Sequence, residues 1–344
     1  MTGPRLSFAL TLALIASACF DAGASDADNA RNGNGNGNGQ DFPRAEQPVD
    51  CPTTGAAMQV LGSGGPIAEG GVPGRAATSY LLWINGEPRL LIDAGSGSFL
   101  RFAEANGKIK TLDAILLSHL HADHAGDLID VLNSGGFEGR TEPLAIIGPG
   151  AAPRFPATTE FLERLLSKDS GAFAYNGGFL DGTENKPLIE SQDVAFAEGA
   201  ENVQDIAVSP DYAVRALPVH HGPVPSLGFM LEIDGKSIVI AGDQSFLSEA
   251  FVAELAGSSP AILFAHHAIN GEDGQPRGLH RTPSEIGELA AKLDPERVVL
   301  NHNMARSLSR IDDNLAAIAE TYAGPVSVAS DLDCYVITSD AQSD

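Results

Sequence analysis

The sequence predicts a layered α/β fold, and two observations lead to this prediction. Short runs of β-branched and other apolar residues alternate with segments of helical periodicity along most of the chain. Residues 52–338 contain no stretch with the composition of a linker. Hydrophobic residues make up 43% of the chain, which is enough to build a sizeable buried core. We therefore expect one folded domain over residues 51–340.

The predicted strands share short apolar runs, and all but the last of the segments end in Gly, Asp or His. In chain order they are residues 58–65, 79–86, 88–97, 113–119, 143–150, 212–221, 227–243, 261–267, 296–302 and 324–337. The segment 227–243 is expected to be a hairpin that turns at Ile-Asp-Gly-Lys. The last segment is expected to form a strand pair.

Four segments have the apolar spacing of helices, and they alternate with the strands. They are residues 126–135, 157–168, 282–293 and 310–322. The third of them has a visible start, because Thr282 can cap it, Pro283 suits its first turn and Glu285 completes a capping box.

Residues 1–19 have the features of an export signal. Arg5 precedes an apolar run at residues 6–18, which is too short for a comfortable membrane span. Small residues then lead to Cys19 in a pattern that resembles a bacterial lipobox; cleavage after Ala24 is the alternative. We expect a protein of the periplasm or cell envelope. If Cys19 carries a lipid, the protein would be an outer-membrane lipoprotein, and that lipid would be its only contact with the membrane.

Residues 20–50 are predicted to be a flexible tether. Their alternating Gly and Asn offer no apolar face, so burial cannot offset the entropy lost on ordering them. Export also bears on the cysteines that remain, Cys51 and Cys334, which flank the predicted domain. A disulfide between them and a pair of free buried thiols are both compatible with the sequence.

The net charge of −24 restricts the partners of the protein. Such a field repels polyanions, and no Lys/Arg-rich run reverses it locally. We therefore expect a small-molecule substrate and no long nucleic acid as a partner.

A dense cluster of histidines is the strongest chemical signal in the chain. Three of its nine histidines lie within six positions, as His119, His121 and His124, together with Asp123. Two residues apart on the tail of a strand, His119 and His121 can face the same way. The following turn brings Asp123 and His124 alongside, so two ligand sets suit two metals that share a bridging water. Imidazole and carboxylate favour zinc, with Mn²⁺ or Fe as alternatives.

The remaining histidines of interest follow predicted strands, as does one aspartate. In layered α/β folds, sites are built at the carboxyl ends of the strands. Packing alone does not explain so many metal-binding residue types at strand ends. The residues are His220, His221, Asp243, His266, His267 and His302.

These motifs resemble those of the metallo-β-lactamase fold. "SHLHADHAGD" at residues 118–127 matches its H-x-H-x-D-H signature, and "HHGPVPSLGF", "IVIAGD" and "VVLNH" follow in the order that the superfamily uses. The chain is most similar to the ribonuclease Z and phosphodiesterase branch through "LGSGG", "LLIDAGSG" and "GLHRTPSEIGELAAKL". The resemblance spans residues 55–338 and implies a four-layer αββα metallo-β-lactamase-like sandwich.

The resemblance also implies metal ligands. One metal would be held by His119, His121 and His221, the other by Asp123, His124 and His302, and Asp243 would bridge both. His221 directly precedes the family-like segment, whereas His220 is the alternative ligand. Asp93 would orient a ligand imidazole, or would simply lie in a Gly-rich turn.

Asp123 and His280 are the residues to which the resemblance gives catalytic roles. His280 stands in "HRT", similar to the ribonuclease Z motif whose histidine helps the leaving oxygen to depart. An exposed loop histidine is the alternative. His266 and His267 would line the pocket, or one ring would be buried and the other exposed.

One departure from the family pattern bears on the substrate. Ribonuclease Z enzymes that process tRNA carry a long basic arm between the third-motif histidine and the bridging aspartate. Here 21 residues separate His221 from Asp243, and they are expected to form a tight hairpin. This argues against tRNA maturation. Residues 150–210 are expected to form a lid or pocket wall that sets substrate choice.

The predicted function is therefore an exported dinuclear-zinc hydrolase that uses a metal-bridging hydroxide on a small phosphodiester, sulfate ester or related ester. A lactonase or β-lactamase on the same fold is the first alternative. A tethered, non-enzymatic metal-binding protein is the second. A homodimer is compatible with the resemblance.

Overall fold

The computed structural model describes residues 51–67, 74–196 and 203–339, all of which belong to one compact unit. The predicted export signal at residues 1–19, with Cys19, and the tether at residues 20–50 lie outside the described residues. Within the described part of the chain, none of the helices has the length and apolar character needed to cross a bilayer.

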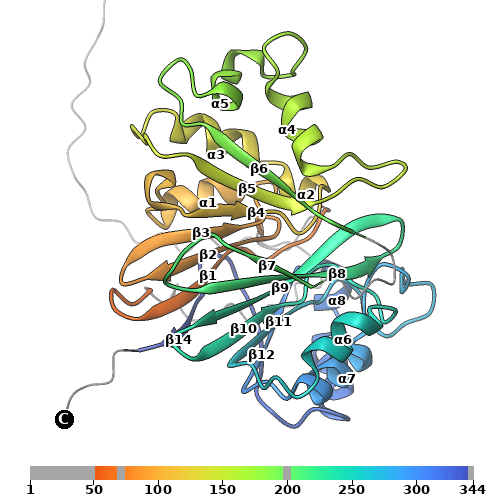
Figure 1. The fold of residues 1–344 in the computed structure, drawn as a ribbon. Helices are drawn as coiled ribbons and strands as arrows, with labels where there is room; N and C mark the ends of the chain where they lie inside the picture. The colour runs from red at the N-terminus through yellow and green to blue at the C-terminus, as the bar shows by residue number, and fades with distance from the viewer. Residues whose placement is uncertain (1–50, 68–73, 197–202, 340–344) are drawn as a thin grey trace, which may run out of the picture. The chain divides into compact units, whose positions relative to one another are not determined.

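Two seven-stranded sheets form the centre of the described structure (Figure 1). The first has the order β14 (Cys334–Thr338), β1 (Ala56–Gly62), β2 (Ser79–Ile84), β3 (Glu87–Ile92), β4 (Ala114–Leu116), β5 (Leu144–Pro149) and β6 (Ile189–Val194). The second has the order β13 (Val326–Val328), β12 (Val298–Asn301), β11 (Ile262–His266), β10 (Lys236–Ile240), β9 (Val224–Ile233), β8 (Ala213–His221) and β7 (Gln204–Ile206).

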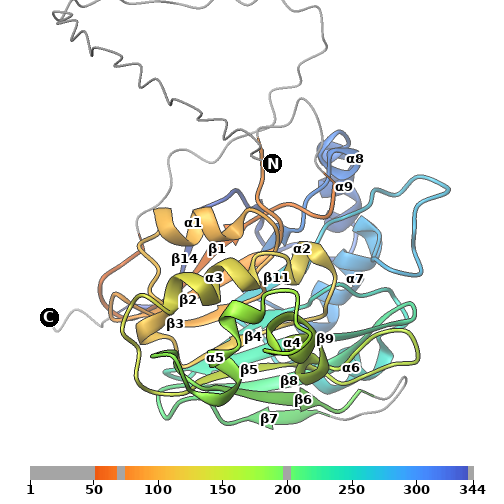
Figure 2. The ribbon, with the colours of Figure 1, turned by 90° about the horizontal axis from the view of Figure 1, so that it is seen from above.

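Helices cover the outer face of each sheet. Those on the first sheet are α1 (Ser98–Glu104), α3 (Leu128–Gly135), α4 (Thr158–Leu166) and α5 (Gly178–Asp181), and Figure 2 shows them from above. Those on the second are α6 (Glu249–Leu255), α7 (Pro283–Leu293) and α9 (Ile311–Ala319). Single turns make up α2 (Ala122–Ala125), α8 (Ala305–Leu308) and two 3₁₀ helices (Ile109–Thr111 and Ala174–Asn176).

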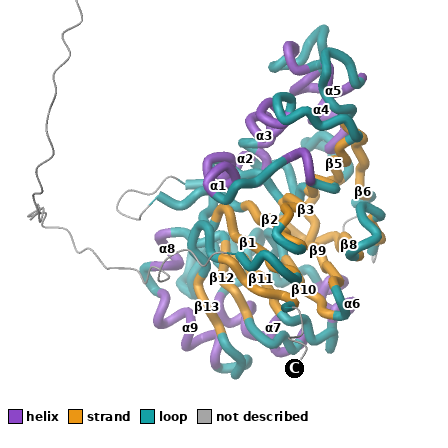
Figure 3. Tube along the Cα trace, turned by 90° about the vertical axis from the view of Figure 1, so that its left-hand side faces the viewer, coloured by secondary structure: helices purple, strands orange, loops and turns teal. Residues whose placement is uncertain are grey.

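Apolar side chains fill the three spaces between these layers. Tyr80 of β2, Phe229 of β9 and Phe264 of β11 are buried between the two sheets. Separate apolar clusters lie between each sheet and its helices. The four-layer αββα sandwich implied by the family resemblance is thus confirmed, and Figure 3 shows the layers from the side.

Most predicted elements are present with boundaries that shift by a few residues. The hairpin turns at Asp234 and Gly235, between β9 and β10. Helix α7 begins with the predicted capping box, in which Thr282 and Glu285 exchange hydrogen bonds.

Two expectations need correction. The strands at residues 324–337 do not pair with each other, because β13 extends the second sheet and β14 extends the first. Residues 150–210 contribute the edge strands β6 and β7, one to each sheet, as well as the packed helix α4, so the described part of this segment belongs to the sandwich and is not a separate lid; its role as a pocket wall stays a prediction.

Cys51 and Cys334 form a disulfide, so the bridge is the correct one of the two alternatives. Their Cα atoms lie 5.4 Å apart, across 283 positions of sequence. The bond connects the chain just before β1 to the start of β14, which is the neighbour of β1 in the sheet.

Strand direction explains where the site can form. β10, β11 and β12 are parallel, and β8 runs the same way because both β8 and β10 are antiparallel to β9. In the first sheet, β3 and β4 are parallel. Side chains that follow these strands therefore meet at one edge of the sandwich.

Candidate metal centre

The H-x-H-x-D-H segment begins just after β4 and ends in the single turn of α2. His121 is the N-terminal cap of this turn, and its carbonyl accepts hydrogen bonds from the backbone N–H groups of His124 and Ala125. The turn packs against Gly95, where an added Cβ would lie only 2.1 Å from the Asp123 carbonyl oxygen. Only glycine allows so close an approach, and the contact fixes α2 against the end of β3.

The first donor group consists of His119, His121 and His221. One ring nitrogen of each lies within 4.8 Å of the others. His119 Nε2 and His121 Nδ1 are 3.0 Å apart. His221 Nδ1 donates to the Leu279 carbonyl at 2.9 Å, which leaves Nε2 of this ring to face the group.

The second donor group consists of Asp123, His124 and His302. Asp123 Oδ2 lies 3.2 Å from His302 Nε2 and 3.6 Å from His124 Nε2. The other nitrogen of His124, Nδ1, lies 2.8 Å from Asp93 Oδ2. Asp93 therefore holds this imidazole with Nε2 directed into the site.

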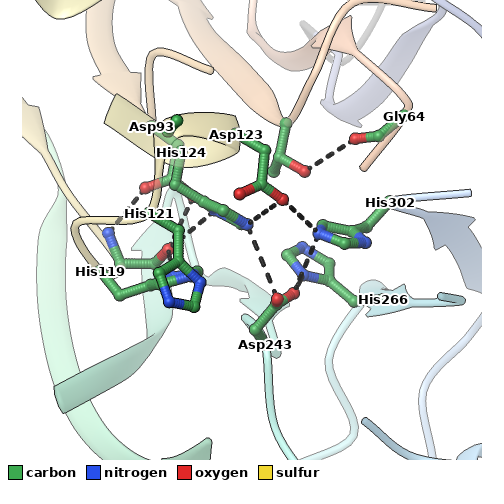
Figure 4. A network of polar contacts seen from close by, with 12 residues as sticks. Gly64, Asp93, His119, His121, Asp123, His124, Asp243, His266 and His302 are labelled. Carbon is green, nitrogen blue, oxygen red and sulfur yellow. Dashed lines mark hydrogen bonds and ion pairs between the residues drawn. The ribbon is translucent and has the colours of Figure 1, made fainter. Parts of the chain in front are cut away.

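Asp243 lies between the two groups, as Figure 4 shows for its contacts with the second. Its Oδ2 is 3.6 Å from His221 Nε2 and 3.8 Å from His124 Nε2. Its Oδ1 is 3.4 Å from His302 Nε2. One carboxylate thus faces donor atoms that come from β8, α2 and the end of β12.

The donor atoms fit a divalent cation. His124 Nε2 is fully buried and has no hydrogen-bond partner among the described residues. Burial holds the pKa of His119 well below its ordinary value, and burial also lowers the pKa of His121 and His221. Neutral imidazoles are the form that binds metals.

The carboxylate of the second group is ionised. Burial by itself would raise the pKa of Asp123, but the hydrogen bond from His302 and the nearby His124 lower it to about 2. Burial would lower the pKa of His124, yet the carboxylates of Asp93 and Asp243 outweigh it and raise that pKa to about 9. A cation bound at His124 Nε2 would replace this proton.

Comparison with known proteins identifies the family. The sequence profile of the metallo-beta-lactamase superfamily matches residues 72–302. The chain belongs to the metallo-beta-lactamase superfamily. Ribonuclease Z of Mycobacterium bovis is 34% identical over 290 residues, which cover 80% of this chain and 96% of that protein. Ribonuclease Z of Mycobacterium marinum is 29% identical with the same coverage.

Two solved structures share the fold of this chain. The short form of human tRNase Z superposes with a TM-score of 0.61 at 20% identity, over 82% of this chain and 99% of that one. Yeast PDE1 has a TM-score of 0.60 at 14% identity, over 83% and 100% of the two chains. The predicted family and its ribonuclease Z and phosphodiesterase branch are confirmed. This superfamily member is a metal-dependent hydrolase that acts on ester bonds.

The two histidines at the end of β8, His220 and His221, have different surroundings. His221 faces the centre of this metallo-beta-lactamase site, whereas His220 Nδ1 lies 2.8 Å from the Ser245 hydroxyl. His280 is 7% exposed, so the alternative of an exposed loop histidine is wrong. Its Nδ1 lies 3.8 Å from Asp243 Oδ2 and has no hydrogen-bond partner within the described ranges.

His266, which ends β11, and His267, which follows it, are both buried, which contradicts the alternative with one exposed ring. His266 Nδ1 lies 2.6 Å from Asp243 Oδ1, and burial lowers the pKa of this ring to about 4. His267 instead contacts Asn303 and Asn314, away from the donor groups. The sequence analysis did not predict the contact between His266 and Asp243. Both residues follow apolar runs at the ends of predicted strands, and this shared position could have indicated it.

Proposed function

We propose that the protein is an exported dinuclear-zinc hydrolase acting on a small phosphodiester, sulfate ester or related ester. The observation that carries the proposal is the position of Asp243 between two groups of histidines and carboxylate. The ligands of one ion would be His119, His121 and His221, those of the other Asp123, His124 and His302, with Asp243 shared. When bound, two zinc ions would lower the pKa of a shared water and orient it for attack.

The surrounding residues would keep the ligands in their working form. Asp93 accepts from the Ser118 N–H at 2.6 Å and from the Ser118 hydroxyl at 2.8 Å, while it faces His124 Nδ1. The Leu279 carbonyl accepts from His221 Nδ1 at 2.9 Å. Each of these acceptors selects the tautomer that presents Nε2 to the centre.

His280 would assist the leaving oxygen. Burial lowers the pKa of His280 to about 3, so the free ring is neutral near pH 7. The ring lies 5.3 Å from that of His221 and 5.5 Å from that of His302, measured between centroids. An anionic ester bound between them would raise the pKa of His280 and favour proton donation at the leaving oxygen.

The structure of the hairpin supports a small substrate over tRNA. All 21 residues between His221 and Asp243 are described, and they form β9, β10 and two short turns, which leaves no arm. The net charge of −24 opposes the approach of a polyanion. Phe155 lies at the rim, with its ring 6.3 Å from that of His121, where it would contact a small organic group.

A location outside the cytoplasm is part of the proposal. The disulfide between Cys51 and Cys334 supports it, because structural disulfides persist in oxidising compartments. Its other support is the signal-like sequence before Cys19. Mass spectrometry of the mature protein from its native envelope would test it; an unprocessed N-terminus with reduced cysteines would contradict it.

Zinc-loaded protein assayed with four substrates tests the activity. We expect two zinc ions per chain and turnover of bis-p-nitrophenyl phosphate or p-nitrophenyl sulfate. Preference for nitrocefin or an acyl-lactone would instead support a β-lactamase or lactonase, and bound zinc without turnover would support a binding protein. H119A should lose zinc and activity. H220N is the matched control, because asparagine can keep the contact with Ser245.

A further inference from the structure

His266 connects the candidate metal centre to the interface between the two sheets. The residue ends β11 and is 5% exposed. Its Nδ1 lies 2.6 Å from Asp243 Oδ1, and its Nε2 lies 3.0 Å from the hydroxyl of Tyr80. Tyr80 comes from β2 of the opposite sheet and is fully buried. Both nitrogens of the His266 ring therefore have partners, although the ring lies close enough to the donor atoms to be a metal ligand itself.

The direction of these hydrogen bonds can be worked out from Asn301. Its Nδ2 lies 2.8 Å from the Tyr80 hydroxyl oxygen and 3.3 Å from the Gly62 carbonyl oxygen. A carbonyl can only accept, so the atom between them must be the amide nitrogen and it donates to Tyr80. The hydroxyl hydrogen of Tyr80 then needs an acceptor, and His266 Nε2 is the remaining partner in the described part of the chain.

The tautomer of His266 follows from this direction. An imidazole that accepts at Nε2 carries its hydrogen on Nδ1. That hydrogen points at Asp243 Oδ1, and a hydrogen bond of 2.6 Å to a carboxylate is short and strong. Hydrogen bonds thus run in one direction from Asn301 through Tyr80 and His266 to Asp243.

We propose that His266 and Tyr80 are positioning residues that fix the carboxylate of Asp243 between the two donor groups. The bond to Oδ1 sets the carboxylate plane, and Oδ2 is then directed toward His221 and His124, at 3.6 and 3.8 Å. His266 is accordingly not a metal ligand. This inference rests on the proposed function, in which Asp243 is the ligand shared by both ions.

The first test is made on metal-free protein and does not depend on activity. Histidine ¹⁵N resonances report which ring nitrogen carries the hydrogen, and the His266 signals are assigned by their loss in H266N. We expect the Nδ1–H tautomer in the wild type and in Y80F, where the Asp243 carboxylate still accepts from Nδ1, and a changed Nε2 shift in Y80F, because this nitrogen loses the hydroxyl that donates to it. An Nε2–H tautomer in the wild type would overturn the proposal.

The second test measures zinc by chelator competition and elemental analysis. H266L should lower zinc affinity about 10- to 100-fold with two sites still filled at saturation. H266N should retain most of the affinity, because its amide can still donate to Asp243. H267N is the matched control, since His267 is an equally buried neighbour that faces Asn303 and Asn314, and its zinc affinity should not change.

The remaining outcomes separate the two proposals. Loss of one zinc equivalent at saturation in both H266L and H266N would make His266 a ligand and overturn the positioning role. Unchanged zinc affinity in H266L would overturn it as well. Wild-type protein that binds no zinc would refute the proposed function, while the tautomer measurement would still report the hydrogen-bond direction on its own.

Discussion

His124 Nδ1 lies 2.8 Å from Asp93 Oδ2, and both side chains are almost completely buried. Asp93 has a left-handed backbone with φ of 59°, at the point where the chain leaves β3. Asparagine tolerates this conformation, so D93N changes the charge with little strain. We expect zinc affinity to fall about 10- to 100-fold in D93N, because the ligand imidazole loses its orienting carboxylate. Isothermal titration with zinc measures this.

The control for this change is D130N, which removes a carboxylate from an exposed position of α3. Its zinc affinity should match that of the wild type. Equal affinities in D93N and the wild type would show that Asp93 does not orient His124.

The backbone of Gly65 packs closely against the imidazole ring of His302. A Cβ at this position would lie 2.8 Å from His302 Cε1 and 3.0 Å from His302 Nδ1. G65A should therefore displace the ring and lower both zinc affinity and kcat/KM, by about 10-fold or more, since ring placement decides ligation. G74A is the matched control, because a Cβ there meets nothing within 4 Å. Wild-type kinetics in G65A would mean that His302 has room to move.

Removal of metal should destabilise the protein. The donor groups bring several buried polar atoms together, and His124 Nε2 has no hydrogen-bond partner among the described residues. Free zinc at 100 times its dissociation constant would stabilise the folded state by about 2.7 kcal/mol. Calorimetry with EDTA and then with added zinc should show a lowered and a restored melting temperature. A melting temperature that changes neither with EDTA nor with added zinc would refute metal binding at this site.

Much of the site could be predicted from sequence because strand ends are recognisable. The apolar runs before His119, Asp243 and His302 marked buried parallel strands, whose carboxyl ends share one edge. The alternation of strands and helices predicted the layered α/β class, whereas the four-layer arrangement came from the family resemblance. The capping box of α7 was readable for a local reason, since Thr282 and Glu285 lie three residues apart.

The missed parts depend on tertiary contacts. β6 was overlooked because four of its six residues are exposed, so no apolar run marks it. β13 and β14 look alike as strands, and nothing in a strand's own pattern states which sheet it joins. The contact of His266 with Tyr80 spans two sheets and 186 positions of sequence, beyond what spacing can show.

The disulfide should contribute to stability. It closes a loop across 283 positions, and long loops lose the most chain entropy in the unfolded state when they are closed. The C51S/C334S double variant should unfold at a free energy about 2–5 kcal/mol lower than the wild type. Urea unfolding of oxidised wild type, reduced wild type and the double variant measures this. Equal midpoints in all three would show that the bond adds nothing.

His267 predicts a pH dependence that is separate from the metal centre. Burial lowers its pKa to about 4 in the folded protein, against an ordinary value near 6.5. Between these values the unfolded chain binds the proton and the folded chain does not, so stability falls as pH falls. The free energy of unfolding falls by about 1.4 kcal/mol for each pH unit in this window. Above pH 6.5 both states are neutral at His267, so the full stability is retained there.

H267N removes this titration and keeps a donor toward Asn303. At pH 7 the variant should be less stable by about 1–3 kcal/mol, because the Asn314 amide loses its acceptor. As the pH is lowered from 6.5 to 4.5, the wild type should lose about 2–3 kcal/mol that the variant does not lose, so the difference between the two shrinks and, where it starts smaller than this loss, changes sign. Urea unfolding of both proteins at several pH values in EDTA measures the two slopes. Parallel slopes would mean that His267 takes up its proton in the folded state, and that its burial between Asn303 and Asn314 does not exclude the charge.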